Sequence, residues 1–148
     1  MHATLVLQGV EDGDRFGQAV ATPGDLDGDG FEELVIAAPC RRAEEAPVNE
    51  HVGAIYVVWG NATRLSSQRT IQLAAPEQDD ILEIQGEFAA DCGATVGLSS
   101  LAQGQGDYDG DGLPDLAFAR ETLGVEVDSG DTSFGLVYLL RWADLDDP

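Results

Sequence analysis

The chain has 148 residues, enough for one domain with a hydrophobic core, and 28 acidic residues against 7 basic ones give it a formal net charge of -21. Such a charge argues against nucleic acid and anionic membranes as partners and favours a cation. The alternative interpretation is a highly solvated surface or an adaptation to salt. No apolar run approaches the roughly 20 residues of a membrane helix, so we expect no membrane insertion. Residues 1–10 have no signal-peptide pattern.

Short runs of β-branched and aromatic residues, bounded by glycine, proline or charge, predict an all-β chain. We expect strands near residues 4–8, 16–22, 33–38, 53–59, 81–85, 93–99, 115–119 and 134–140, with a further short piece at 70–74. Two segments rich in charge and in glycine, proline or serine are predicted to be surface loops, at residues 40–52 and 120–133.

An acidic phrase, GDLDGDGFEEL at residues 24–34, recurs as GDYDGDGLPDL at residues 106–116. The same shift of 82 aligns residues 53–59 with 135–141, and upstream a shift of 76 aligns residues 15–21 with 91–97. Residues 5–9 match residues 82–86 at a shift of 77. Short antiparallel strands in a repeat of this length predict propeller blades.

Each acidic phrase places carboxylates at positions one, three, five and nine of a nine-residue loop, with glycines that allow a tight curl. Calcium takes six to eight oxygen ligands, whereas magnesium demands a strict octahedron and zinc prefers nitrogen or sulfur. An EF-hand is excluded because position twelve is Ile36 or Phe118, inside strand-like runs. The alternative is an acidic turn without metal. We predict two Ca²⁺ ions per chain, with these ligands: Asp25, Asp27, Asp29, the carbonyl of Phe31 and Glu33; Asp107, Asp109, Asp111, the carbonyl of Leu113 and Asp115.

Residues 15–39 and 53–60 resemble an FG-GAP repeat of the integrin-alpha β-propeller family. The "FG" pair is Phe16-Gly17, and "GAP" reads as Ala37-Ala38-Pro39. The second repeat diverges, with Cys92-Gly93 and Ala119-Arg120-Glu121 at the corresponding places. The resemblance implies four-stranded antiparallel blades, calcium in the loop between the first two strands of a blade, and an extracellular or cell-surface location.

On this basis residues 1–148 form one domain of two blades: an orphan outer strand at 1–9, blade one at 10–90, and blade two at 91–148, which lacks its outer strand. Two blades cannot close a ring, because propellers need about four to eight. We therefore predict a head-to-tail homo-oligomer, in which strand 4–8 of one chain completes blade two of the next. Three chains would give six blades and four would give eight. The alternative is a fragment of a longer extracellular propeller protein.

The predicted function is a calcium-stabilised structural, adhesion or ligand-binding module that recognises a protein or glycan. A glycan-binding propeller with Trp59 or Trp142 as a stacking platform is the alternative. No Ser-His-Asp set, nucleophile elbow or phosphate loop is present in the sequence, so we predict no enzymatic activity. Cys40 and Cys92 are expected at strand ends on one face of adjacent blades, so a disulfide between them is a hypothesis, while two separate buried thiols are the favoured interpretation.

Overall fold

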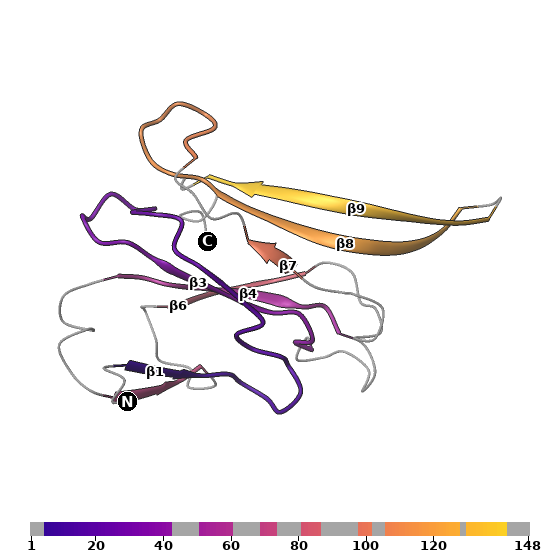
Figure 1. Cartoon of the computed structure of the whole chain (residues 1–148), viewed down its shortest axis with the longest axis horizontal. Coiled ribbons are helices and arrows are strands. Elements are labelled where there is room, and N and C mark those ends of the chain that lie inside the picture. The colour runs from indigo at the N-terminus through magenta and orange to yellow at the C-terminus, as the bar shows by residue number, and fades with distance from the viewer. Residues whose placement is uncertain are drawn as a thin grey trace.

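A computed structural model describes residues 5–42, 51–60, 69–73, 81–86, 98–101, 106–127 and 130–141. Within these ranges every regular element is a β-strand, which confirms the predicted all-β class (Figure 1). No helix in the described part of the chain is long and apolar enough to cross a bilayer.

Blade one is a four-stranded antiparallel sheet. Its strands follow the order β2 (Ala19–Ala21), β3 (Leu34–Ala38), β4 (Ala54–Val58) and β6 (Ile81–Gln85). They lie inside the four segments predicted for this blade, and the predicted four-stranded blade is confirmed. β3 and β4 consist of β-branched and other apolar residues, and they pair in register with Ile36 opposite Tyr56.

Blade two contributes three described strands, in the antiparallel order β7 (Leu98–Leu101), β8 (Leu116–Val127) and β9 (Gly130–Leu140). The loop prediction for residues 120–133 is wrong, because β8 and β9 continue through 120–127 and 130–133 as one long hairpin. The composition of this segment is polar, but Val125 and Val127 alternate along it as in a strand, and backbone pairing continues between Val127 and Gly130. Of the predicted strand 93–99, residues 93–97 lie outside the described residues.

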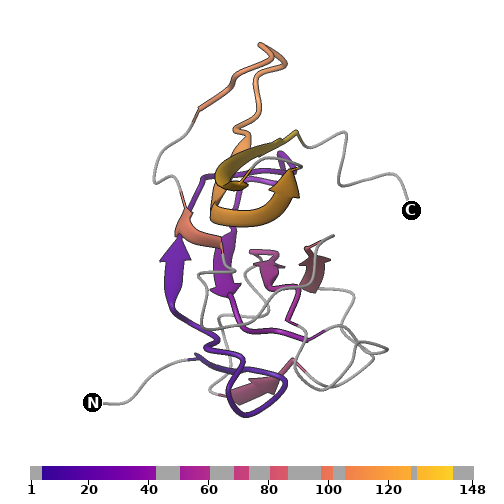
Figure 2. The same ribbon diagram turned by 90° about the vertical axis from the view of Figure 1, so that its right-hand side faces the viewer.

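The third sheet is a two-stranded ribbon of β1 (Leu5–Gln8) and β5 (Arg69–Gln72), paired in parallel with Leu5 opposite Arg69. Both segments were predicted as strands, but the sequence did not indicate that they pair with each other. Figures 1 and 2 show the three sheets as stacked layers, with blade one between blade two and the ribbon.

The interface between the two blades is the main hydrophobic core, which we call the interblade core. One face of β3 and β4 packs there against alternate residues of β8, and one residue of the first acidic loop joins them. All seven of its side chains are at most 6% exposed. They are Leu26, Val35, Ala37, Ile55, Val57, Leu116 and Phe118.

The opposite face of blade one is covered by the ribbon. Ile36, Tyr56 and Val58 are buried there, with Leu7 of β1 and Leu73 packed against them. Phe16 meets the Tyr56 ring edge-on at a centroid distance of 5.5 Å. Both faces of the central strands are therefore removed from water.

A buried arginine ties the segment after β1 to the outer strand of blade one. Arg41 is 7% exposed, and its guanidinium lies 3.5 Å from Glu11, 4.0 Å from Asp14 and 3.2 Å from Glu83 of β6. Burial raises the pKa of Asp14, and the nearby Arg41 charge opposes that rise. A buried cation needs such partners, because leaving it unpaired costs several kcal/mol.

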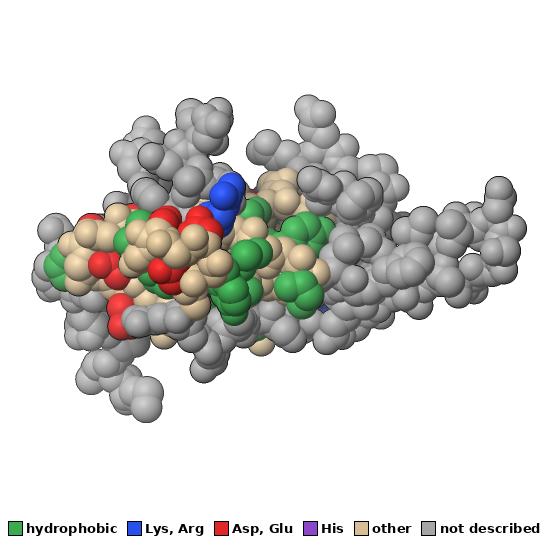
Figure 3. Space-filling model, turned by 90° about the horizontal axis from the view of Figure 1, so that it is seen from above, with side chains coloured by type: hydrophobic (Ala, Val, Ile, Leu, Met, Phe, Trp, Pro, Cys, Tyr) green, Lys and Arg blue, Asp and Glu red, His purple; other side chains and the backbone are tan. Residues whose placement is uncertain are grey.

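The outer face of blade two is apolar and open to solvent. Val137 is 79% exposed and Leu139 is 45% exposed, and these two residues of β9 lie opposite Ala119 and Ala117 of β8. We call these four residues the open face. In Figure 3, which looks down on the side of the molecule that carries β9, apolar side chains gather beside acidic ones.

Replacing a leucine by alanine should have a large effect on stability on one face of blade two and a small effect on the other. Leu116→Ala removes a side chain that is 0% exposed in the interblade core and should lower the free energy of unfolding by about 2–5 kcal/mol. Leu139→Ala, on the open face, should change it by less than about 1 kcal/mol. Urea denaturation of dilute protein measures both, and equal losses would contradict the packing described here.

Candidate metal centre

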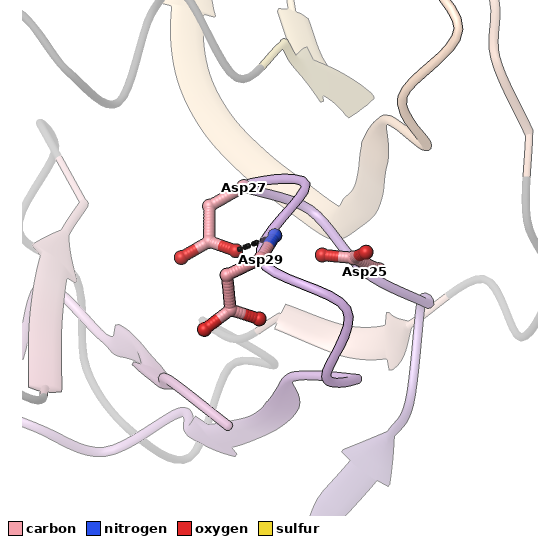
Figure 4. A group of neighbouring side chains, drawn as sticks. All are labelled: Asp25, Asp27 and Asp29. Carbon is pink, nitrogen blue, oxygen red and sulfur yellow. Dashed lines mark hydrogen bonds between the residues drawn. The ribbon is translucent and has the colours of Figure 1, made fainter. Parts of the chain in front are cut away.

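The first acidic loop, residues 25–33, joins β2 to β3 and gathers three carboxylates. Asp25, Asp27 and Asp29 each offer an oxygen, and these oxygens lie within 4.8 Å of one another (Figure 4). This is the spacing at which several oxygen ligands share one cation.

Backbone hydrogen bonds hold the three carboxylates in place. The N–H of Gly30 donates to Asp25 Oδ2 at 2.9 Å, the N–H of Asp29 donates to Asp27 Oδ1 at 3.0 Å, and the N–H of Phe31 donates to Asp29 Oδ1 at 2.8 Å. One oxygen of each carboxylate is thereby fixed and the other is left for a ligand. The second oxygen of Asp25, Oδ1, is buried and has no hydrogen-bond partner in the described part of the chain.

The second loop, residues 107–115, repeats these three bonds and adds one from the N–H of Gly110 to Asp107 Oδ1 at 2.6 Å. The N–H of Gly112 donates to Asp107 at 2.9 Å, that of Asp111 to Asp109 at 3.1 Å, and that of Leu113 to Asp111 at 2.8 Å. Each donor and acceptor lies 82 residues beyond its counterpart, so the sequence repeat is also a repeat of hydrogen bonds. Oxygens of Asp107, Asp109 and Asp115 lie within 4.8 Å of one another.

Two glycines in each loop adopt backbone angles that other residues avoid. Gly28 and Gly30 have φ of 76° and 93°, and their equivalents Gly110 and Gly112 have φ of 83° and 95°. At such angles a β-carbon is strained, so the curl that points the carboxylates inward depends on glycine.

The carboxylate at position nine differs between the loops. Glu33 is 0% exposed, and it accepts hydrogen bonds from the N–H groups of Leu26 and Gly60. Asp115 accepts the equivalent bond from the N–H of Tyr108 at 2.6 Å. It also belongs to the cluster of three carboxylates in the second loop. The longer glutamate side chain thus braces the first loop against the end of β4.

Two carboxylates of the first loop, Asp27 and Glu33, lie where burial disfavours their ionised form. Burial raises the pKa of Asp27; the N–H of Asp29 opposes this rise, and the charges of Asp29 and Asp25 add to it. Burial also raises the pKa of Glu33, and the hydrogen bonds that Glu33 accepts from the N–H groups of Leu26 and Gly60 oppose this rise. A divalent cation would turn this repulsion into attraction.

The side chain at position two of the first loop packs in the core between the blades, which the sequence analysis did not predict. Leu26 stands between two aspartates, yet it is 1% exposed and belongs to the interblade core. Its equivalent in the second loop, Tyr108, is 64% exposed. An apolar residue between two acidic ones was the available signal.

Other predicted residues have the following places. Asp111, which accepts the Leu113 bond, and the carbonyls of Phe31 and Leu113 remain predicted ligands. Trp59 packs against the interblade core, and Trp142 lies outside the described residues.

Cys40 is 2% exposed and carries no free thiol. Cys92 lies outside the described residues, so the disulfide between the two cysteines stays a prediction.

The antiparallel sheets packed face to face have the architecture of β-propeller blades. The family model of the FG-GAP repeat matches residues 16–58, which cover blade one from Phe16 to the end of β4, and the chain therefore contains an FG-GAP repeat. The second copy rests on the internal equivalence described above.

Similar proteins agree with this classification. The chain is 33% identical over 122 residues to integrin alpha-5 of Xenopus laevis and 37% identical over 119 residues to integrin alpha-V of Gallus gallus, with 80% and 78% of this chain covered. It is also 30% identical over 112 residues to phosphatidylinositol-glycan-specific phospholipase D of Bos taurus, with 76% covered. The chain spans only about a tenth of the length of these relatives: 10% of integrin alpha-5, 10% of integrin alpha-V and 12% of the phospholipase D.

Glu33 offers a test of how the first loop is braced. Glu33→Ala would leave two backbone N–H groups without their acceptor and should cost about 1–3 kcal/mol for each that stays buried. Glu32→Ala is the matched control, because Glu32 is exposed beside it. Thermal unfolding of both variants checks this, and a Glu33→Ala variant as stable as the control would contradict the bracing role.

Proposed function

We propose that the chain is a calcium-binding β-propeller module that holds one ion in each acidic loop. The observation that carries the proposal is the recurring geometry: two nine-residue loops, each with three carboxylate oxygens within 4.8 Å and three backbone hydrogen bonds in common. Acidic side chains alone are common on surfaces. A buried aspartate oxygen without a hydrogen-bond partner among the described residues is costly, and a cation would satisfy it.

The donor set suits a hard cation of flexible coordination. Carboxylate oxygens are available at alternate positions, and the proposed carbonyls of Phe31 and Leu113 would add uncharged oxygens. No histidine or cysteine lies within either loop, which disfavours zinc. Glu33 would be a further ligand in the first loop, and Asp111 would be a further ligand in the second.

Calcium in this proposal has a structural role. Leu26 lies in the interblade core and its N–H is bound by Glu33, so a cation that fixes the first loop also fixes the junction of the blades. We propose a non-catalytic adhesion or ligand-binding module, with a protein or glycan as ligand, in an extracellular or cell-surface location. The similarity to integrin alpha chains supports the adhesion part of this proposal.

Calcium should stabilise the folded chain, because ligands that bind only the native state shift the folding equilibrium by mass action. At free calcium about 100-fold above Kd, each site contributes about 2.7 kcal/mol. Differential scanning calorimetry with calcium and with chelator should show a clear rise in melting temperature.

Variants assign that response to the loops. Asp27→Ala together with Asp109→Ala should abolish most of the calcium-induced rise, while Asp12→Ala, an exposed aspartate outside both loops, should keep it. A melting temperature that is the same in calcium and chelator would remove the basis of the proposal.

We further propose that copies of the chain close a propeller ring head to tail, as trimers or tetramers, with β1 of one copy completing blade two of the next. The outer edge of β9 has no partner strand among the described residues, whereas the equivalent edge of β4 is paired with β6. An unpaired edge and an uncovered apolar face both favour association.

Native mass spectrometry and light scattering test ring closure. We expect three or four chains per particle in calcium and a smaller mass in chelator, because each chain carries a net charge of -21 that bound cations reduce. A monomeric mass over the full concentration range would contradict ring closure and leave the calcium proposal intact.

A further inference from the structure

One face of blade one is closed, while the equivalent face of blade two is open. The closed face consists of cross-strand pairs from β3 and β4 that are all 0% exposed: Val35 with Val57 and Ala37 with Ile55. The equivalent residues, 82 positions further along the chain, are the four residues of the open face: Ala117 paired with Leu139 and Ala119 paired with Val137. The two blades present the same kind of surface in the same register, and only one of these surfaces is covered.

The contact between the two blades within the chain shows which side chains pack against such a surface. Blade two supplies large apolar side chains from the opposite face of β8 and β9, with the Phe118 and Tyr138 rings stacked at 5.0 Å. These side chains are Leu116, Phe118, Tyr138 and Leu140. Their equivalents at a shift of 82 form the second face of blade one and are again large and apolar: Leu34, Ile36, Tyr56 and Val58. The junction inside the chain therefore joins two unlike faces, and each blade carries one of each kind.

The second face of blade one is covered by the ribbon in the single chain. Leu7 and Leu73 pack on it, and the N–H of Leu73 donates to the carbonyl of Gln8 at 3.0 Å, which joins the two strands. The ribbon is small, with four residues in each strand, and Val6 of β1 is 46% exposed. β1 also matches β6 at a shift of 77, and β6 pairs antiparallel with β4. β1 thus matches in sequence a strand that pairs with a central blade strand, although in this structure it lies beside β5.

We propose that the open face of blade two is the docking surface for blade one of a second copy, and that the ribbon is a cap that must leave before docking. The second copy would present Leu34, Ile36, Tyr56 and Val58. Movement of its β1 from β5 to the edge of β9 would uncover that face and complete the neighbouring sheet in one step. This proposal rests on ring closure as proposed above and names the two surfaces that make the ring.

The second acidic loop supports this location. Tyr108 holds the loop position at which Leu26 enters the interblade core, but it is 64% exposed. Docking of a second copy would bury Tyr108 as blade two buries Leu26. The acidic loop beside the open face also gives docking a calcium requirement, because its carboxylates would otherwise repel another chain with a net charge of -21.

The test places charge on the open face. Val137→Asp with Leu139→Asp in the full chain, with calcium present, should raise the concentration needed for self-association at least about tenfold, because carboxylates would be buried without partners. The melting temperature of the dilute monomer should change little, since both side chains are exposed. Analytical ultracentrifugation over a concentration series measures the association.

Arg15→Asp is the matched control, because it changes the net charge as much as the two open-face substitutions together. Arg15 is exposed, lies outside β1, the open face and both acidic loops, and has a φ of 55°, which aspartate tolerates. This variant should associate as the unmodified chain does. If the open-face variant also does so, the open face is not the docking surface, even though ring closure itself stands.

A second variant tests the cap. Leu73→Asp should loosen the ribbon from blade one and lower the concentration needed for association, and adding the open-face substitutions should remove that gain. Association of Leu73→Asp that persists with the open face charged would overturn the proposal, because another surface would then be responsible. If the unmodified chain and Leu73→Asp both stay monomeric in calcium, no second copy docks; a calcium-dependent melting temperature would still support the metal sites.

Discussion

A propeller blade is a single sheet with two apolar faces, and the need to cover both faces is the constraint on which this structure depends. In β4 every side chain is buried, and in β3 only the first is partly exposed. Burial on both sides is favourable because apolar surface removed from water contributes about 25 cal/mol per Å². Blade two covers one face and the ribbon covers the other, so a blade cannot be considered apart from its neighbours.

The acidic loops take part in this packing. Leu26 belongs to the first loop and to the interblade core, and Glu33 links its N–H to that of Gly60 just beyond β4. Loop geometry and blade packing are therefore coupled, so a change in the loop would alter the packing between the blades. The second loop keeps the corresponding bond between Asp115 and Tyr108, but its position-two side chain is exposed. The same local construction has different consequences because only one of the two loops faces a neighbouring blade within the chain.

Much of blade one could be predicted from the sequence, because its four strands carry strong local patterns of β-branched and apolar residues bounded by turns. The hairpin of β8 and β9 was missed over residues 120–133, where polar composition indicated a loop. Backbone pairing between two adjacent segments outweighed composition there. The parallel pairing of β1 with β5 was also beyond local reasoning, since its partners are 64 residues apart, as between Leu5 and Arg69.

The sequence by itself determined the shape of each acidic loop, because the bonds that hold the carboxylates span only two to five residues, as from Asp25 to Gly30 and from Asp27 to Asp29. It also determined the register of the repeat, since each acidic loop and the two strands that follow it recur at a shift of 82. Only the tertiary structure decided that Glu33 braces Gly60, which is 27 residues away, and that Leu26 is buried while Tyr108 is exposed. These differences depend on which sheet lies against which, and that is a matter of long-range packing which a local pattern does not encode.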